Sequence, residues 1–137
     1  MTAGYSGTPL AQKLGLERGM RVWFHNMPES VRAEIDPDGL NIDTQATASA
    51  GLQGAHIFVT ERSHLERELP ALRELIAPNG FVWVSWPKKA SGVACEVSED
   101  MIREVALPTG LVDVQVCAVD EIWSGLKLVI RKELRDR

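Results

Sequence analysis

The sequence predicts an α/β fold with a mostly parallel sheet, shortened and closed at its C-terminal end by an antiparallel hairpin. Short apolar runs of strand length recur along the first two thirds of the chain, and segments with helical spacing separate them. These strand–helix–strand units require parallel crossovers. Near the C-terminus, two alternating segments stand only a few residues apart, which favours antiparallel neighbours.

The N-terminal elements are predicted from capping signals and apolar runs. Thr8-Pro9 is expected to open a short helix over residues 9–14, which Gly15 ends. The apolar and aromatic run over residues 20–24 is the first core strand. Asn26 is expected to cap the helix that follows.

The next segment predicts a turn, a short strand, a loop and a buried strand. Pro37-Asp38-Gly39 has turn composition, and residues 40–44 are expected to form a short second strand. The small, weakly polar residues 46–54 predict a loop within the domain. Residues 55–60 form another nearly continuous apolar run, typical of a strand covered on both faces.

A capping box and a turn frame the central helix. Ser63 and Glu66 are expected to open it, and Pro70 is expected to kink or restart it. Asn79-Gly80 predicts a tight turn into the third buried strand, residues 81–86.

The C-terminal third predicts one more helix and the hairpin. Ser98 is expected to cap the helix, which Pro108 and Gly110 stop. Residues 111–120 alternate between apolar and other side chains, as do residues 126–132 after a short loop.

Length and composition indicate one soluble domain over residues 1–137, with residues 1–16 as a lead-in segment. The 137 residues are 45% hydrophobic and 25% charged, and no apolar run reaches the ~20 residues of a membrane-spanning helix. The N-terminal MTAGYSGTPL lacks a secretory signal pattern, so we expect a cytoplasmic protein with no membrane partner. The formal net charge of −4 argues against a nucleic-acid partner.

The cysteines and histidines predict neither a disulfide nor a metal centre. Cys95 and Cys117 lack the spacing of a bridge or a zinc site and are expected to be free thiols. His56 lies inside an apolar strand and is expected in the core, whereas His64 is expected on a helix surface. Three histidines spread in this way give no metal triad in sequence.

The order of these elements resembles the class I methyltransferase-like Rossmann fold. LRELIAPNGFVWVSW in particular is similar to the helix-turn-strand that leads into the fifth strand of that superfamily. YSGTPLAQKLGL, WPKKASGV and GLVDVQVCAVDEIWSGLK resemble an uncharacterised bacterial family, short relatives of that fold. The second resemblance implies a fold and no established activity.

The loop after the first strand argues against S-adenosylmethionine, the cofactor that this resemblance implies. Methyltransferases place a glycine-rich loop there, because glycines let the backbone approach the cofactor. In this chain the loop reads His25-Asn26-Met27-Pro28-Glu29, and residues 44–55 are too few for the usual helix–strand–helix block. Asp43 could hold ribose hydroxyls or be a solvated turn residue. On this reasoning the cofactor is disfavoured.

The candidate ligand site lies where the strands of a parallel sheet end, because ligands bind outside the carboxyl ends of such strands. Lys88 and Lys89 are either a solvated charge pair or an anion site assisted by Ser91, and Trp86 and Trp123 are possible walls. The hairpin loop is expected at the same edge, where the carboxylates of Asp120 and Glu121 would hold the two ammonium groups in place. No catalytic residue and no metal ligand is assigned. The expected ligand-binding residues are His25, Asn26, Thr60, Trp86, Lys88, Lys89, Ser91, Asp120, Glu121, Trp123 and Ser124.

Three functions fit these observations. The sequence favours a methyltransferase-like domain that has lost methyl transfer and binds a small anionic ligand or a protein partner at the carboxyl edge of the sheet. The first alternative is a small S-adenosylmethionine-dependent methyltransferase with an atypical cofactor loop. The second is a structural protein-interaction module.

Overall fold

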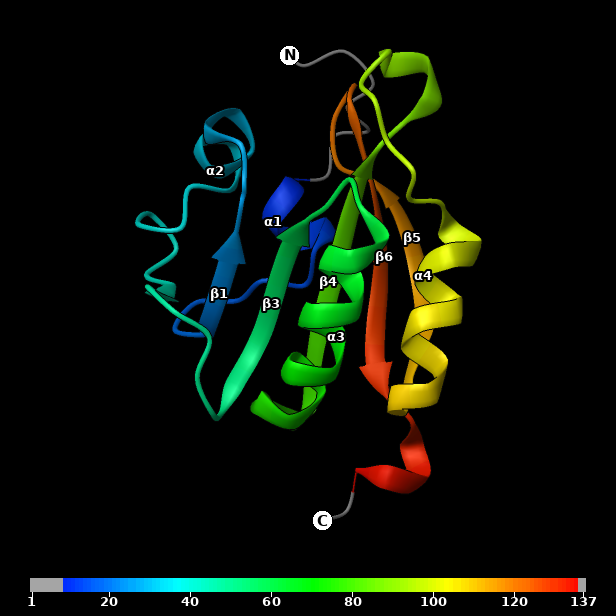
Figure 1. Ribbon diagram of the computed structural model, residues 1–137. Helices are drawn as coiled ribbons and strands as arrows, with labels where there is room; N and C mark the ends of the chain where they lie inside the picture. Colours follow the sequence, from blue (N-terminus) through cyan, green and yellow to red (C-terminus); the bar gives the residue numbers. More distant parts are fainter. Residues whose placement is uncertain (1–8, 136–137) are drawn as a thin grey trace.

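The computed structural model describes residues 9–135, which form a six-stranded sheet with helices on both faces (Figure 1). The helices are α1 (Leu10–Lys13), α2 (Glu29–Ile35), α3 (Arg62–Leu75) and α4 (Glu99–Ala106). The strands are β1 (Arg21–His25), β2 (Asp43–Gln45), β3 (Leu52–Phe58), β4 (Ile76–Pro87), β5 (Leu111–Ala118) and β6 (Trp123–Ile130).

The strands lie side by side in the order β2-β1-β3-β4-β6-β5. The first four are parallel, β6 is antiparallel to β4, and β5 is antiparallel to β6. The C-terminal hairpin therefore adds two antiparallel strands to a parallel core. The fold class predicted from the sequence is confirmed.

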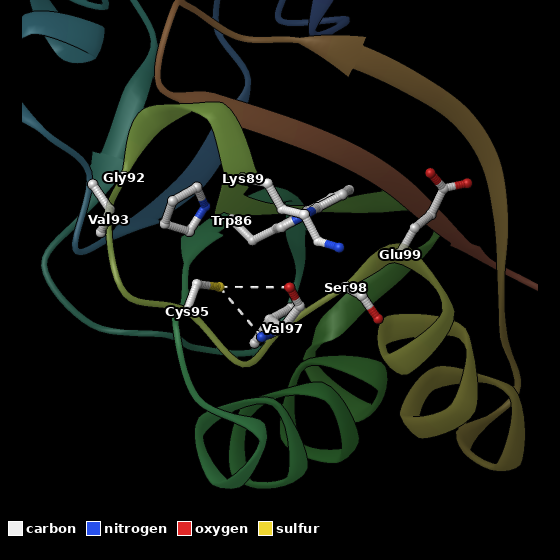
Figure 2. A pocket seen from close by; sticks show the side chains of 9 residues that line it. Trp86, Lys89, Gly92, Val93, Cys95, Val97, Ser98 and Glu99 are labelled. Atoms are coloured by element: carbon white, nitrogen blue, oxygen red, sulfur yellow. Dashed lines mark hydrogen bonds between the residues drawn. The ribbon is translucent and has the colours of Figure 1, made fainter.

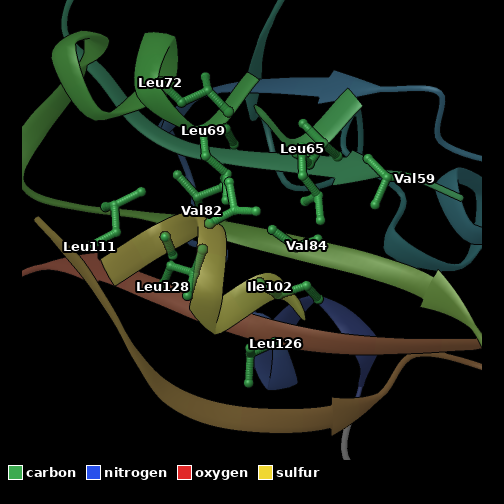
Figure 3. Packing of buried hydrophobic residues seen from close by; sticks show 14 of the residues in the cluster. Val59, Leu65, Leu69, Leu72, Val82, Val84, Ile102, Leu111, Leu126 and Leu128 are labelled. Atoms are coloured by element: carbon green, nitrogen blue, oxygen red, sulfur yellow. The ribbon is translucent and has the colours of Figure 1, made fainter. Parts of the chain in front are cut away.

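Helices α3 and α4 cover one face of the sheet with a continuous apolar layer (Figure 3). Leu65, Leu69 and Leu72 follow the helical period along α3 and are fully buried in this layer, together with Val82 and Val84 of β4. Hydrophobic burial on this side thus fixes the rotation of α3 about its axis. That rotation decides which of its polar side chains face the neighbouring strand ends.

Helices α1 and α2 cover the opposite face. Val31 and Ile35, one turn apart on α2, are buried there, as is Leu14 after α1. The indole Nε1 of Trp83 in β4 donates a hydrogen bond of 2.8 Å to the Leu14 carbonyl. This buried bond ties the N-terminal segment to the centre of the sheet.

Strand β4 begins earlier than the sequence predicts. It starts at Ile76, opposite Leu52, and the next aligned pair is Gly54 with Phe81. The Asn79-Gly80 pair therefore lies within an irregularity of the strand and is not a turn between helix and strand.

Two predicted helix starts are wrong, although the helices exist. Asn26 does not cap α2, because the residue at the cap position is Pro28. Ser63 does not cap α3, which begins at Arg62, and Glu66 instead contacts Arg62 at 2.9 Å. Helix α3 also continues through Pro70 as one element.

Other capping predictions are confirmed within the described residues, and one lies outside them. The side chain of Ser98 accepts a hydrogen bond of 3.2 Å from the Met101 backbone N–H and so caps α4. Gly15 and Gly110 adopt left-handed conformations after the elements they end. Thr8, the expected cap of the first helix, lies outside the described residues.

The edge strand β5 departs from the expected alternation. Its register shifts between Asp113 and Gln115, and beyond that point Val114 and Val116 are exposed while Cys117 is buried. Cys95 and Cys117 are both free thiols, as predicted. Among residues 9–135, no helix has the length and apolar character to cross a membrane.

Candidate functional site

The carboxyl ends of β1 and β3 mark the point where the chain connections diverge. From β1 the chain passes through α2 to β2 on one side, and from β3 it passes through α3 to β4 on the other. In open α/β sheets, ligands bind outside the carboxyl ends of the strands at such a point. His25, at the end of β1, and Thr60, just after β3, lie at this edge.

A histidine pair with a nearby carboxylate occupies this edge. His25 stacks on Trp23 of the same strand, with ring centroids 4.8 Å apart, and its Nε2 lies 2.9 Å from Nε2 of His64 on α3. Glu68 is one helical turn beyond His64, and its Oε2 lies 3.9 Å from His64 Nε2. The side chains of His64 and Glu68 are only 14% and 16% exposed. Burial, aided by His25 and Arg67, lowers the pKa of His64.

This cluster was not predicted from the sequence, which placed His64 on a helix surface. The available signal was the spacing of His64 and Glu68, which puts both side chains on one face of a helix. Nothing in the sequence pattern relates that face to His25, which is 39 positions away from His64 in the chain.

A pocket of about 460 Å³ lies where β4 ends (Figure 2). The loop that follows β4 wraps around it and returns to the start of α4. Trp86 provides an aromatic wall, and Lys89 provides an ammonium group from a short 3₁₀ turn. The full lining consists of Trp86, Pro87, Lys89, Gly92, Val93, Cys95, Val97, Ser98 and Glu99.

Three polar side chains of this pocket are already engaged by the protein, one of them Ser98, which caps α4. The Sγ of Cys95 accepts a hydrogen bond of 3.2 Å from the Val97 backbone N–H. Glu99 forms an ion pair with Arg103, which also binds Asp113 of β5 at 2.9 Å. These carboxylates raise the pKa of the Arg103 guanidinium. Lys89 is therefore the charged pocket residue with the greatest freedom to meet a ligand.

Lys88 and the loop between β5 and β6 lie next to each other beyond the end of β4, but the contact between them differs from the expected one. The ammonium of Lys88 donates to the backbone carbonyl of Asp120 at 2.8 Å, and the Lys88 N–H donates to the Ile122 carbonyl at 2.8 Å. The Asp120 carboxylate accepts from the backbone N–H groups of Ile122 and Trp123, each at 2.8 Å. Lys88 therefore braces the hairpin loop, and the expected pairing of lysines with these carboxylates is wrong.

Of the other expected site residues, some make contacts within the fold and others are exposed. Ser91 donates from Oγ to the Lys88 carbonyl at 2.7 Å, which stabilises the turn. Trp123 packs edge-to-face on Phe58 at 4.9 Å, and Ser124 pairs with Trp86 in the sheet. Asn26 and Glu121 are exposed.

Asp43 lies at the opposite edge from the one expected. It is the first residue of β2 and pairs in register with Arg21, the first residue of β1. Both strands are parallel, so Asp43 belongs to the amino edge of the sheet. It cannot hold a ligand at the carboxyl ends.

Comparison with solved structures shows that the fold is that of SAM-dependent methyltransferases, where SAM denotes S-adenosylmethionine. A SAM-dependent methyltransferase from Aquifex aeolicus has a TM-score of 0.61 at 14% identity, and the alignment covers 88% of each chain. LepI in complex with SAM has a TM-score of 0.58 at 10% identity, over 90% of this chain and 47% of LepI. Magnesium protoporphyrin IX methyltransferase from Synechocystis PCC 6803, with bound SAM, has a TM-score of 0.57 at 10% identity. That alignment covers 88% of this chain and 74% of the Synechocystis enzyme.

This chain spans about half of the length of LepI. No family model and no curated protein matches its sequence. The resemblance to an uncharacterised bacterial family therefore stays a prediction.

The prediction that disfavoured SAM is overturned by these comparisons. LepI, a fibrillarin from Aeropyrum pernix and the Synechocystis enzyme all hold SAM on a fold that covers about nine tenths of this chain. The argument from missing glycine was too strict, because Asn26 itself adopts the left-handed conformation after β1, with φ 58°. Asparagine tolerates that conformation better than most residues, so the chain makes a tight bend there without glycine.

Proposed function

We propose that this protein is a small SAM-dependent methyltransferase with an atypical cofactor loop. The observation that supports this most is the coincidence of two features at one edge of a methyltransferase fold. The connections diverge at the carboxyl ends of β1 and β3, and the 460 Å³ pocket lies at the end of the adjacent strand β4. Pockets of about 300 to 1,000 Å³ are typical of small-molecule sites.

The residues at the end of β1 and after β3 fit the polar parts of the cofactor. Asn26, the exposed residue at the left-handed bend, has a side-chain amide that offers both a donor and an acceptor. Thr60 is partly exposed and offers a hydroxyl group. SAM supplies an electrophilic methyl group on its sulfonium centre. Asn26 and Thr60 would hold polar groups of the cofactor at this edge.

The pocket after β4 would take the methyl acceptor. Trp86 offers an aromatic wall for a flat or apolar part, and the Lys89 ammonium offers a partner for an anionic group. Lys88 has no such role here, because its ammonium binds the Asp120 carbonyl. The expected acceptor is therefore a small molecule with both an apolar and an anionic part.

Titration calorimetry with S-adenosylhomocysteine, the demethylated product, tests this function. We expect one site per chain, with affinity reduced about 2- to 10-fold in Thr60→Val, because one lost hydrogen bond costs about 0.5–1.5 kcal/mol. Ser63→Ala is the matched control, since Ser63 is exposed near the same edge and has no assigned role. Trp86→Ala should retain cofactor binding and weaken acceptor binding. Absence of binding in the folded wild type would contradict the proposal.

A further inference from the structure

We propose that His25, His64 and Glu68 form a binding site for a divalent transition-metal ion, with Zn²⁺ as the preferred ion. The potential ligand atoms of these three residues all lie within 4.8 Å of one another. Two imidazole nitrogens and one carboxylate oxygen are a ligand set that zinc accepts. The proposal is independent of the proposed function, because its test uses the metal alone.

The distances are close to those of a bound ion. A tetrahedral zinc with Zn–N bonds of about 2.0–2.1 Å holds two ligand nitrogens about 3.3 Å apart. The two Nε2 atoms are 2.9 Å apart, and Glu68 Oε2 is 3.9 Å from His64 Nε2. An ion would therefore require side-chain rotations that bring the Glu68 carboxylate oxygen closer to both imidazoles.

The scaffold holds the three side chains in place. His25 is the last residue of β1, and its ring stacks on Trp23 at an interplanar angle of 26°. His64 and Glu68 are one turn apart on α3, beside Leu65, which is fully buried. The ligands therefore come from two rigid elements packed in the same apolar layer. Such prior positioning lowers the entropy cost of ion binding.

Within the protein, one hydrogen bond of 2.9 Å joins the two histidines, and the glutamate is held only by long contacts. The Glu68 carboxylate lies 3.4 Å from Nε of Arg67 and 3.9 Å from Nε2 of His64, both long for charge-assisted hydrogen bonds. The two imidazoles direct their Nε2 atoms at each other, so neither of these nitrogens points at the carboxylate as its closest partner. If His64 donated a hydrogen bond to Glu68, its Nε2 would lie closer to the carboxylate oxygen than the 3.9 Å observed. A cation bound between the three side chains would accept the Nε2 lone pair of each histidine and would pair with the Glu68 carboxylate.

Three protein ligands leave one position of a tetrahedral ion open. Sites of this composition keep water or a small ligand in that position, whereas structural zinc sites are closed by four protein ligands. The cluster lies at the carboxyl edge next to the bend at Asn26. The open position would accordingly take an oxygen or nitrogen donor from a small molecule bound at this edge.

Titration calorimetry with Zn²⁺ on chelator-treated protein tests the site. We expect one ion per folded chain, binding at least 100-fold weaker in His25→Ala and His64→Ala, and 10-fold or more weaker in Glu68→Gln. Glu66→Gln is the matched control on the same helix, since the exposed Glu66 pairs with Arg62 away from the cluster, and the affinity of this variant should equal that of the wild type. Cys95→Ser should also bind normally, which distinguishes this site from thiol binding. Circular dichroism confirms that each variant is folded.

Cobalt substitution gives a second and independent readout. Co²⁺ in a tetrahedral site of the wild type should show strong visible absorption bands, and these bands should be lost in His64→Asn, which keeps a polar side chain of moderate size. The proposal is overturned if the folded wild type binds neither ion at one equivalent. It is equally overturned if affinity and spectrum are unchanged when His25 and His64 are both replaced.

Discussion

The buried His56 should make the folded protein sensitive to acid. His56 lies in β3 with 2% exposure, stacks on Phe58 at 4.5 Å, and contacts the Ser85 hydroxyl through Nε2 at 2.7 Å. Its Nδ1 has no hydrogen-bond partner among the described residues. Protonation would place a cation in this apolar layer, so burial lowers the pKa of His56 from 6.5 to about 3.

The magnitude follows from the difference between the folded and unfolded pKa values. Because the folded pKa of His56 is the lower one, its contribution to stability is fully present above pH 6.5 and is lost as the pH falls towards 3. Each pH unit within that interval costs about 1.4 kcal/mol. Between pH 7 and pH 5 the free energy of unfolding should therefore fall by about 2 kcal/mol.

Urea unfolding at pH 7 and pH 5 measures this loss. The comparison variant is His56→Leu with Ser85→Ala, which removes the titrating ring and leaves no orphaned hydroxyl. Other titrating groups are common to both proteins, so the difference between the two pH dependences isolates His56. Wild type should lose about 2 kcal/mol more than the double variant. Equal losses in the two proteins would refute the reasoning.

Three further predictions concern packing and the rim. Leu69→Ala should lower the free energy of unfolding by about 2–5 kcal/mol in urea titrations, because Leu69 is fully buried under α3. Lys88→Met should cost about 1.5–3 kcal/mol, because it removes a charged hydrogen bond to the hairpin, whereas Lys89→Met should change the melting temperature little. Gly54→Ala should cost about 1–3 kcal/mol, since the new Cβ would lie 2.7 Å from Phe81 Cζ, and the added cost should shrink in a Phe81→Leu background.

The fold was predictable because it depends on patterns that are local in the chain. Apolar runs and helical stripes locate the strands and helices, and the Ser98 cap confirms how directly a single residue can mark a helix start. Boundaries were less predictable where tertiary contacts override local preference. Strand β4 extends back to Ile76 because β3 offers it a partner at Leu52.

The candidate site was less predictable because it depends on which elements meet. The sequence places Lys88 near the hairpin correctly, yet the ammonium binds a backbone carbonyl, which no residue pattern reveals. His64 meets His25 only because buried leucines set the rotation of α3 beside β1. Asp43 was misplaced because β2 starts three residues later than expected, which moves that residue to the amino edge.

The central claim is that SAM binds at the carboxyl ends of β1 and β3. The most direct measurement is an NMR titration of the isotope-labelled protein with SAM, followed through backbone amide shifts. The account predicts saturable changes that centre on His25, Asn26 and Thr60, with little change at Asp43 on the amino edge. No saturable change, or changes confined to the amino edge or to β5, would contradict it.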